Sequence, residues 1–132
     1  MKVVIDTNTI VSGTIKRTGN PAEIMNLFYN GEIQLYYSKD TFAEYERVLG
    51  YEKFHIPQDE QDNILQIIAE VGILIDPPIS DIHFTDETDR PFYDTAKESG
   101  AILITGNDRH YPKEPFIIKP ADFVKRIENQ KK

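Results

Sequence analysis

The sequence contains no cysteine and no apolar run long enough to cross a membrane. Without cysteine the chain cannot form a disulfide bond, a zinc–thiolate site or a cysteine nucleophile. A membrane-spanning helix needs about 20 mostly apolar residues, so no membrane contact is expected. The apolar start of the chain is short and runs directly into Asp6, so no signal peptide is expected either. A cytoplasmic location fits these absences.

Positive charge is also scarce, because 15 lysine and arginine residues stand against 22 aspartate and glutamate residues, for a net charge of −7. This deficit argues against broad, sequence-independent binding to a phosphate backbone. It does not exclude an enzyme that acts on nucleic acid, since a carboxylate cluster attracts phosphate once it holds divalent cations. With 132 residues, of which 39% are hydrophobic, the sequence predicts one globular domain over residues 1–132.

Short apolar runs alternate with amphipathic segments along the chain. The runs predict strands at residues 3–5, 33–37, 73–75, 101–104 and 116–118. The amphipathic segments predict helices at residues 10–15, 21–29, 39–49, 59–71, 89–99 and 121–129. Alternation of this kind predicts an α/β fold, with a parallel sheet covered by helices on both faces.

Asp6 is the first polar residue after the strand at residues 3–5. In an open parallel sheet, ligands bind beyond the carboxyl ends of the strands, which is where Asp6 is predicted to lie. Aspartate in such a place commonly caps the following helix or turn, and Asp6 on its own favours that interpretation. A functional interpretation therefore requires other carboxylates at the same edge.

Further oxygen-bearing side chains are predicted at this edge of the sheet. Glu44 lies early in the helix after the second strand, and Asp89 starts the helix that leads to the fourth strand. Asn107 and Asp108 directly follow the fourth strand. Each alone is explained by capping or by a solvated surface position. Together they would repel one another unless cations lay between them, so the pattern predicts a Mg²⁺ or Mn²⁺ site.

A metal ion at this edge could lower the pKa of a bound water and make it a nucleophile towards phosphorus. Such chemistry needs no Ser/His/Asp arrangement, and none is apparent in the sequence. His55, His83 and His110 fall in unrelated loops, so a histidine metal site is not predicted.

Four segments of the chain resemble a PIN domain. They are residues 3–8 (Val-Val-Ile-Asp-Thr-Asn), the helix start from Ser38 to Glu44 and Tyr45, residues 86–92, and residues 103–107. The resemblance covers nearly the whole chain in the right order, and it is greatest to the toxins of toxin–antitoxin systems related to the VapC nucleases. It implies a three-layer α/β/α fold with a central, mainly parallel five-stranded sheet, and the activity of a metal-dependent endoribonuclease.

The resemblance also implies roles for individual residues. Asp6, Glu44 and Asp89 match the first three acids of the family pattern and would hold Mg²⁺ or Mn²⁺. Asp89 takes the third place because it stands seven residues before Ala96, as the family pattern requires. Where the family has a fourth acid this chain has Asn107, a neutral oxygen ligand, with Asp108 beside it. We count both as catalytic candidates.

Other polar residues are expected around this centre. Hydrogen bonds that orient the acids are expected from Thr7, Asn8, Ser12 and Thr105. Contacts to substrate phosphates are expected from Arg17, Arg90 and Arg109, and also from Lys16 and Lys113, although ordinary surface charge explains each of them alone. Asp86 and Asp94 are extra acids, and Asp94 is predicted to be solvated, because it lies five residues after Asp89 on a different helical face.

Three functions are compatible with this pattern. The first is a ribonuclease that cleaves single-stranded or looped RNA, whose splayed strands can reach a recessed carboxylate pocket. The second is a PIN-fold module that binds RNA or protein without nuclease activity, which Asn107 and the acidic balance support. The third, a flavodoxin-like receiver or small phosphatase, is disfavoured because such domains usually carry paired acids after the first strand.

Two protein partners are expected if the chain is a toxin. One is an antitoxin that covers the pocket with an amphipathic segment and places a basic side chain among the acids. The other is a second copy of the chain, in a homodimer. Tyr51, Phe54 and Ile56 are predicted to be exposed apolar positions for either contact. The alternative interpretation is that these three residues form a small apolar cluster beneath a loop.

Overall fold

The computed structural model describes residues 1–131 and contains a five-stranded sheet in which every neighbouring pair of strands is parallel. The strands are β1 (Lys2–Ile5), β2 (Gln34–Tyr37), β3 (Ile73–Leu74), β4 (Ile102–Ile104) and β5 (Ile117–Ile118), in the order β3-β2-β1-β4-β5. The central strand is β1, and its residues Val3, Val4 and Ile5 are fully buried. The predicted parallel α/β fold is confirmed.

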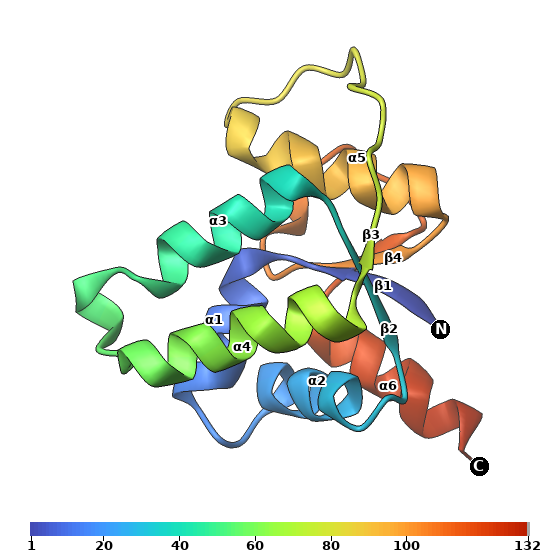
Figure 1. Cartoon of the computed structure of the whole chain (residues 1–132). Helices are drawn as coiled ribbons and strands as arrows, with labels where there is room; N and C mark the ends of the chain where they lie inside the picture. The colour runs from blue at the N-terminus through green and yellow to red at the C-terminus, as the bar shows by residue number, and fades with distance from the viewer. Residues whose placement is uncertain (132) are drawn as a thin grey trace.

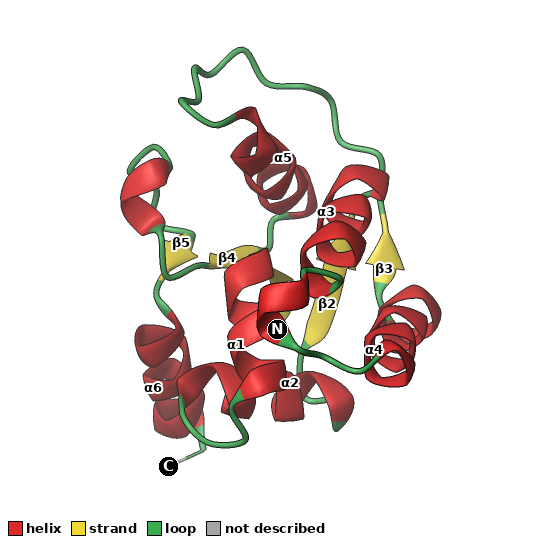
Figure 2. Ribbon diagram, turned by 90° about the vertical axis from the view of Figure 1, so that its left-hand side faces the viewer, coloured by secondary structure: helices red, strands yellow, loops and turns green. Residues whose placement is uncertain are grey.

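Within residues 1–131, six α-helices and three short 3₁₀ helices surround the sheet. The α-helices are α1 (Thr7–Ile15), α2 (Asn20–Tyr29), α3 (Lys39–Leu49), α4 (Gln58–Val71), α5 (Arg90–Ser99) and α6 (Pro120–Gln130). The 3₁₀ helices are η1 (Glu52–Phe54), η2 (Glu87–Asp89) and η3 (Asp108–His110). Helix α5 packs on one face of the sheet, and α1, α2 and α6 lie on the other (Figures 1 and 2). Within residues 1–131, no helix combines the length and the apolar character that crossing a bilayer requires.

The carboxyl end of β1 passes directly into helix α1. The Asp6 amide still donates to the Ile104 carbonyl at 3.0 Å, which extends the pairing of β1 with β4 by one residue. Helix α1 begins at the next residue, because the Asp6 side chain accepts from the Thr7 amide and caps it. The predicted helix at residues 10–15 therefore starts three residues earlier, and Asp6 is held by both a strand and a helix.

Helix α3 crosses the carboxyl edge of the sheet, where it contacts both α1 and α5. Its start is fixed by a capping box in which the Ser38 and Thr41 side chains each accept from the other's backbone amide. Further along, Tyr45 is fully buried and its hydroxyl donates to the carbonyl of Ile5. This bond anchors α3 to the last residue of β1, and so places the neighbouring Glu44 near Asp6.

The segment between β3 and α5 contradicts one prediction. Asp94 was expected to be solvated, but it is only 6% exposed, and its Oδ2 atom accepts from the Ser80 amide at 3.2 Å. The Arg90 guanidinium donates to the carbonyls of Ser80 and Ile82 and so holds the same loop against α5 (Figure 1). The face of α5 that carries Asp94 is therefore covered by the loop that directly precedes this helix.

The turn between α3 and α4 corrects a second prediction. Ile56 was expected to be exposed, but it is buried, with 9% of its surface accessible. Tyr51 and Phe54 are half-buried and pack against the core. The prediction was wrong for Ile56 because this turn folds back onto the core. The alternative interpretation, an apolar cluster beneath a loop, describes this residue better.

Candidate active site

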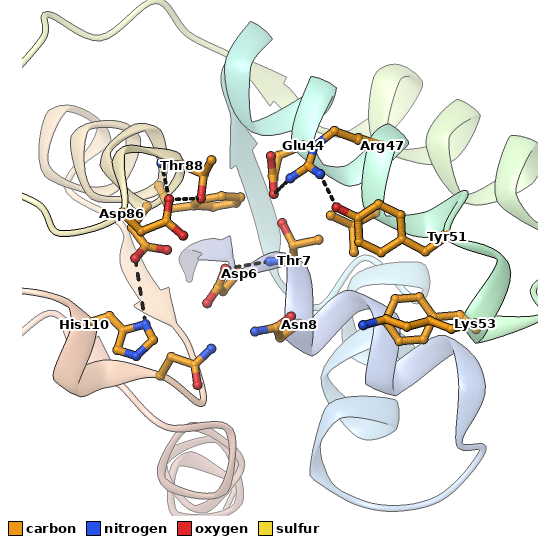
Figure 3. Close-up of a pocket in the computed structure, with 15 residues that line it drawn as sticks. Asp6, Thr7, Asn8, Glu44, Arg47, Tyr51, Lys53, Asp86, Thr88 and His110 are labelled. Carbon is orange, nitrogen blue, oxygen red and sulfur yellow. Dashed lines mark hydrogen bonds and ion pairs between the residues drawn. The ribbon is translucent and has the colours of Figure 1, made fainter.

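A cavity of about 350 Å³ lies at the carboxyl edge of the sheet and brings together four of the five predicted catalytic residues (Figure 3). Its lining includes Asp6, Thr7, Asn8, Glu44, Asp89 and Asn107. These residues come from the junction of β1 and α1, from α1, α3 and η2, and from the loop after β4, so the cavity forms only when segments distant in sequence come together. Asp6 lies at its centre in Figure 3, with Glu44 and His110 on opposite sides.

The carboxylate of Asp6 is held in one orientation by two hydrogen bonds. Its Oδ1 atom accepts from the Thr7 amide at 2.8 Å, and its Oδ2 atom accepts from the Thr105 hydroxyl at 2.6 Å. The Thr105 hydroxyl in turn accepts from the Asn107 amide at 3.0 Å. Thr7 thus acts through its backbone, while its own hydroxyl is buried and has no hydrogen-bonding partner among residues 1–131.

Burial, and to a lesser extent the neighbouring acids, disfavours the ionised forms of Asp6 and Asp89. Burial raises the pKa of Asp6, and the charge of Glu44 raises it further against the lowering effect of its two hydrogen bonds. Burial raises the pKa of Asp89 from 3.8 to about 6, with the charges of Asp6 and Asp86 acting in the same direction. The cavity therefore concentrates negative charge that the surrounding protein does not fully neutralise.

The raised pKa of Asp89 predicts a pH-dependent gain in stability when this residue is neutralised. A carboxyl group whose pKa is higher in the folded state stabilises the fold at low pH, and this contribution is lost as the pH rises from 3.8 to about 6. We therefore expect Asp89→Asn to raise the melting temperature of the metal-free protein at pH 8 and to change it little at pH 4. Thermal unfolding measures both values.

The exposed Asp62 on α4 provides the matched control for this prediction. Asp62→Asn should leave the melting temperature nearly unchanged at both pH values. An equal effect of Asp89→Asn at pH 4 and pH 8 would mean that the Asp89 carboxylate is not destabilised by its surroundings.

Glu44 faces the cavity but is paired with a cation. The Arg47 guanidinium donates to its Oε1 atom at 2.6 Å and also donates to the Tyr51 hydroxyl (Figure 3). The Glu44 side chain is 19% exposed and that of Arg47 is 53% exposed, so water competes for this ion pair. Glu44 can therefore exchange Arg47 for another cation without leaving its place on α3.

The structure leaves several predicted residues outside the cavity lining. Ser12 lies within α1, Arg17 is exposed in the loop between α1 and α2, and Asp108 begins η3. The Arg90 guanidinium already donates to the carbonyls of Ser80 and Ile82, and its Nε atom donates to the Glu87 carboxylate at 2.9 Å. Arg109 lines a smaller adjoining cavity together with Asp86, Asp89 and His110. Of the three predicted arginines, only Arg109 is thus near the acidic cluster.

Four charged residues line the cavity without having been predicted there: Arg47, Lys53, Asp86 and His110. The spacing of three residues between Glu44 and Arg47 is a helical ion-pair signal that could have identified Arg47. Asp86 accepts from the amide and hydroxyl of Thr88, which lowers its pKa. His110 Nδ1 lies 3.9 Å from the Asp89 carboxylate, a proximity that depends on the path of the loop after β4.

The donor chemistry of this cavity suits a hard divalent cation. Burial is the main cause of the raised pKa values of Asp6 and Asp89, and the charge of Asp6 adds to the shift of Asp89, so a cation beside them would favour their ionised forms. Among residues 1–131, no group of three or more acidic or histidine side chains is arranged to hold a metal ion. Mg²⁺ usually needs only one or two carboxylates, with water and substrate phosphates as its other ligands. Asp6 and Asp89 meet that requirement, and Glu44 could join them on leaving Arg47.

Two comparisons relate this chain to known proteins. The profile of the PIN domain family matches residues 2–109, which include Asp6, Glu44, Asp89 and Asn107. An uncharacterized protein of Methanocaldococcus jannaschii is 33% identical over 114 residues, which cover 81% of this chain and 71% of the relative. The profile match thus extends over β1 to β4 and over every acidic residue that lines the cavity.

Proposed function

The chain belongs to the PIN domain family, whose members are mostly metal-dependent nucleases, and from this we propose that it is a Mg²⁺- or Mn²⁺-dependent endoribonuclease that serves as the toxin of a toxin–antitoxin pair. One observation carries the nuclease part of the proposal. Asp6 and Asp89 share a cavity at the carboxyl edge of the sheet, and the pKa of each is raised there. Such perturbed groups gather where binding or catalysis requires them.

The residues of the cavity divide the work of phosphodiester hydrolysis. Asp6 and Asp89, with Glu44 after release from Arg47, would hold the cation. When bound, this cation supplies the acidity that makes a water nucleophilic near neutral pH. The side-chain NH₂ groups of Asn8 and Asn107 can donate hydrogen bonds to phosphate oxygens, and Lys53 offers a positive charge at the rim of the cavity. Thr105 keeps Asp6 in a fixed orientation, so little reorganisation is needed when substrate binds.

Unpaired RNA is the substrate that fits this arrangement. The acids lie in a recess at the end of the sheet, and a flexible single strand can bring a phosphate into it more easily than a duplex can. The net charge of −7 means that affinity for RNA must come from local contacts in this recess.

The toxin part of the proposal rests on the resemblance to VapC-like proteins. An antitoxin with a basic side chain would find a complementary charge in the acids of the cavity. A homodimer is proposed on the same resemblance. Co-expression with the adjacent small open reading frame, followed by size-exclusion chromatography with light scattering, would show whether a complex forms and whether each partner is dimeric. A monomer that binds no product of a neighbouring gene would contradict this part alone.

Two observations favour a second candidate, a PIN-fold module that binds RNA or protein without cleaving it. Asn107 stands where the family pattern has a fourth acid, and Glu44 is paired with Arg47. The purified protein should be incubated with labelled single-stranded and duplex RNA, with Mn²⁺, with Mg²⁺ or with EDTA. The nuclease proposal expects cleavage of the single strand that EDTA abolishes. Binding without cleavage under all conditions would support the second candidate.

The ion pair of Glu44 and Arg47 predicts that removing the arginine strengthens metal binding. In Arg47→Met the Glu44 carboxylate loses its cationic partner and becomes available to an added metal ion. An exposed ion pair of this type predicts roughly a two- to fivefold gain in Mn²⁺ affinity, measured by calorimetric titration. Arg126→Met, at an exposed position of α6, removes the same charge away from the cavity and should change the affinity less. Equal effects of the two variants would assign the gain to net charge alone.

A further inference from the structure

We propose that the turn at residues 51–54 is a docking site for one unpaired RNA base next to the phosphate that is cleaved. The proposal rests on the proposed function and adds to it the part of the substrate that this surface recognises. Tyr51, Lys53 and Phe54 line the same cavity as the catalytic acids. In Figure 3, Tyr51 and Lys53 lie on the side of the cavity where α3 ends. We call these three residues the aromatic turn.

The two rings of the aromatic turn lie nearly parallel to each other. Their centroids lie 6.1 Å apart and their planes differ by 19°, so they face nearly the same direction. The turn is a single 3₁₀ helix, in which the Phe54 amide donates to the Tyr51 carbonyl at 3.1 Å. Buried Ile56 anchors its end, and the Gln61 side chain donates to the Ile56 carbonyl at 2.8 Å. The rings are thus held in place by the backbone and by the core.

Two cations accompany these rings. Lys53 Nζ lies 5.8 Å from the centroid of Tyr51 and 5.2 Å from that of Phe54. The Arg47 guanidinium carbon lies 5.4 Å from the Tyr51 centroid. Aromatic rings beside lysine or arginine are the combination with which proteins bind single-stranded nucleic acid, since the rings stack on bases and the cations contact phosphates. Both halves of that combination are present at the rim of the acidic cavity.

The charges around the aromatic turn limit the ligand to about one nucleotide. Glu52 within the turn and Glu46 on α3 before it are both exposed, and they would repel a backbone that ran past them. Lys53 and Arg47 point the available positive charge towards the rings and the cavity. An unpaired base could stack on the rings while its phosphate, turned into the cavity, contacts the two cations. A protein partner with a purely apolar contact would leave Lys53 without an anionic partner and Arg47 with Glu44 alone.

The absence of tryptophan from the chain makes a direct test possible. Phe54→Trp introduces a single tryptophan whose fluorescence is quenched when a base stacks on it. The measurement uses a single-stranded RNA with Mg²⁺ in an Asp6→Asn background, so that the strand stays intact. We expect quenching by the single strand and none by a fully paired duplex of the same sequence. The matched control is Tyr29→Trp in the same background, at an exposed aromatic position on α2, where no quenching is expected.

Two further variants test the stacking and charge contributions separately. Phe54→Leu keeps an apolar side chain but removes the ring, and should weaken binding of the single strand at least roughly fivefold, whereas Phe54→Tyr should restore it. Lys53→Gln should reduce the slope of log affinity against log salt by about 0.7, the value for one phosphate contact on a single strand. Circular dichroism and thermal unfolding establish that each variant is folded.

The outcomes separate this proposal from the proposed function. If the protein binds RNA by fluorescence anisotropy but the tryptophan of Phe54→Trp is not quenched, the docking site is disproved and the nuclease proposal stands. If quenching occurs but the wild type cleaves no RNA, the docking site stands and the nuclease proposal fails. Equal quenching in Phe54→Trp and Tyr29→Trp would also overturn the docking site, because it would mean that the RNA binds without preference for the aromatic turn.

Discussion

Replacing Asp6 with asparagine is expected to abolish RNA cleavage while the protein remains folded. The neutral side chain can still accept from the Thr7 amide and cap α1, because asparagine caps helices about as well as aspartate does. It cannot supply the negative charge that a divalent cation requires. Loss of a residue that only orients a metal ligand typically costs about 10–100-fold in activity, so loss of the ligand should cost more. The rate of cleavage of a labelled single strand measures the effect.

Asp59→Asn provides a close structural control for Asp6→Asn. Asp59 also lies at the start of a helix, and its Oδ1 atom accepts from the next residue's amide at 3.0 Å, but it is exposed on α4. Its replacement should leave the cleavage rate within about twofold of the wild type, because surface substitutions away from a site have small effects. A cleavage rate in Asp6→Asn equal to that of the wild type would exclude this cavity as the active site.

Thr105→Val is expected to reduce both cleavage and stability. The valine has nearly the same shape but cannot donate to Asp6 Oδ2 or accept from the Asn107 amide. Leaving buried polar groups without partners costs about 1–3 kcal/mol of the free energy of unfolding, measured by denaturant titration. The freed Asp6 carboxylate should lower the cleavage rate about 10–100-fold, as loss of a ligand-orienting residue does in metal sites.

Thr105→Ser separates the hydroxyl group from the side-chain shape. Serine keeps the donor and the acceptor and loses one methyl group, so the cleavage rate should return to within about fivefold of the wild type even if some stability is lost. If valine and serine at this position behaved alike in the cleavage assay, the bond from Thr105 to Asp6 would have no part in activity.

The sheet could be predicted from sequence because its strands are short apolar runs, each followed by polar residues. Buried parallel strands require such runs, and amphipathic helices between them leave few other arrangements. The two interpretations of Asp6 turned out to be compatible. It caps α1, and the same capped position places its carboxylate in the cavity. A capping role therefore gave no reason to discount a functional one.

The surroundings of the acids could not be predicted, because they depend on contacts between distant segments. Asp94 is buried because the long loop between β3 and α5 folds back over α5. His110 reaches Asp89 only through the path of the chain after β4. Phe54 and Lys53 line the cavity because the turn after α3 folds back onto the core. None of these placements follows from periodicity or from local spacing.

The central claim is that Asp6 and Asp89 bind a divalent cation, and calorimetric titration of Mn²⁺ into the metal-free protein tests it most directly. The wild type should bind Mn²⁺, and Asp6→Asn and Asp89→Asn should each lose most of that affinity, whereas Asp59→Asn should bind like the wild type. Because deprotonation of Asp89 accompanies binding, the affinity should also fall as the pH is lowered through about 6. Equal Mn²⁺ affinity in the wild type, Asp6→Asn and Asp89→Asn would contradict the claim.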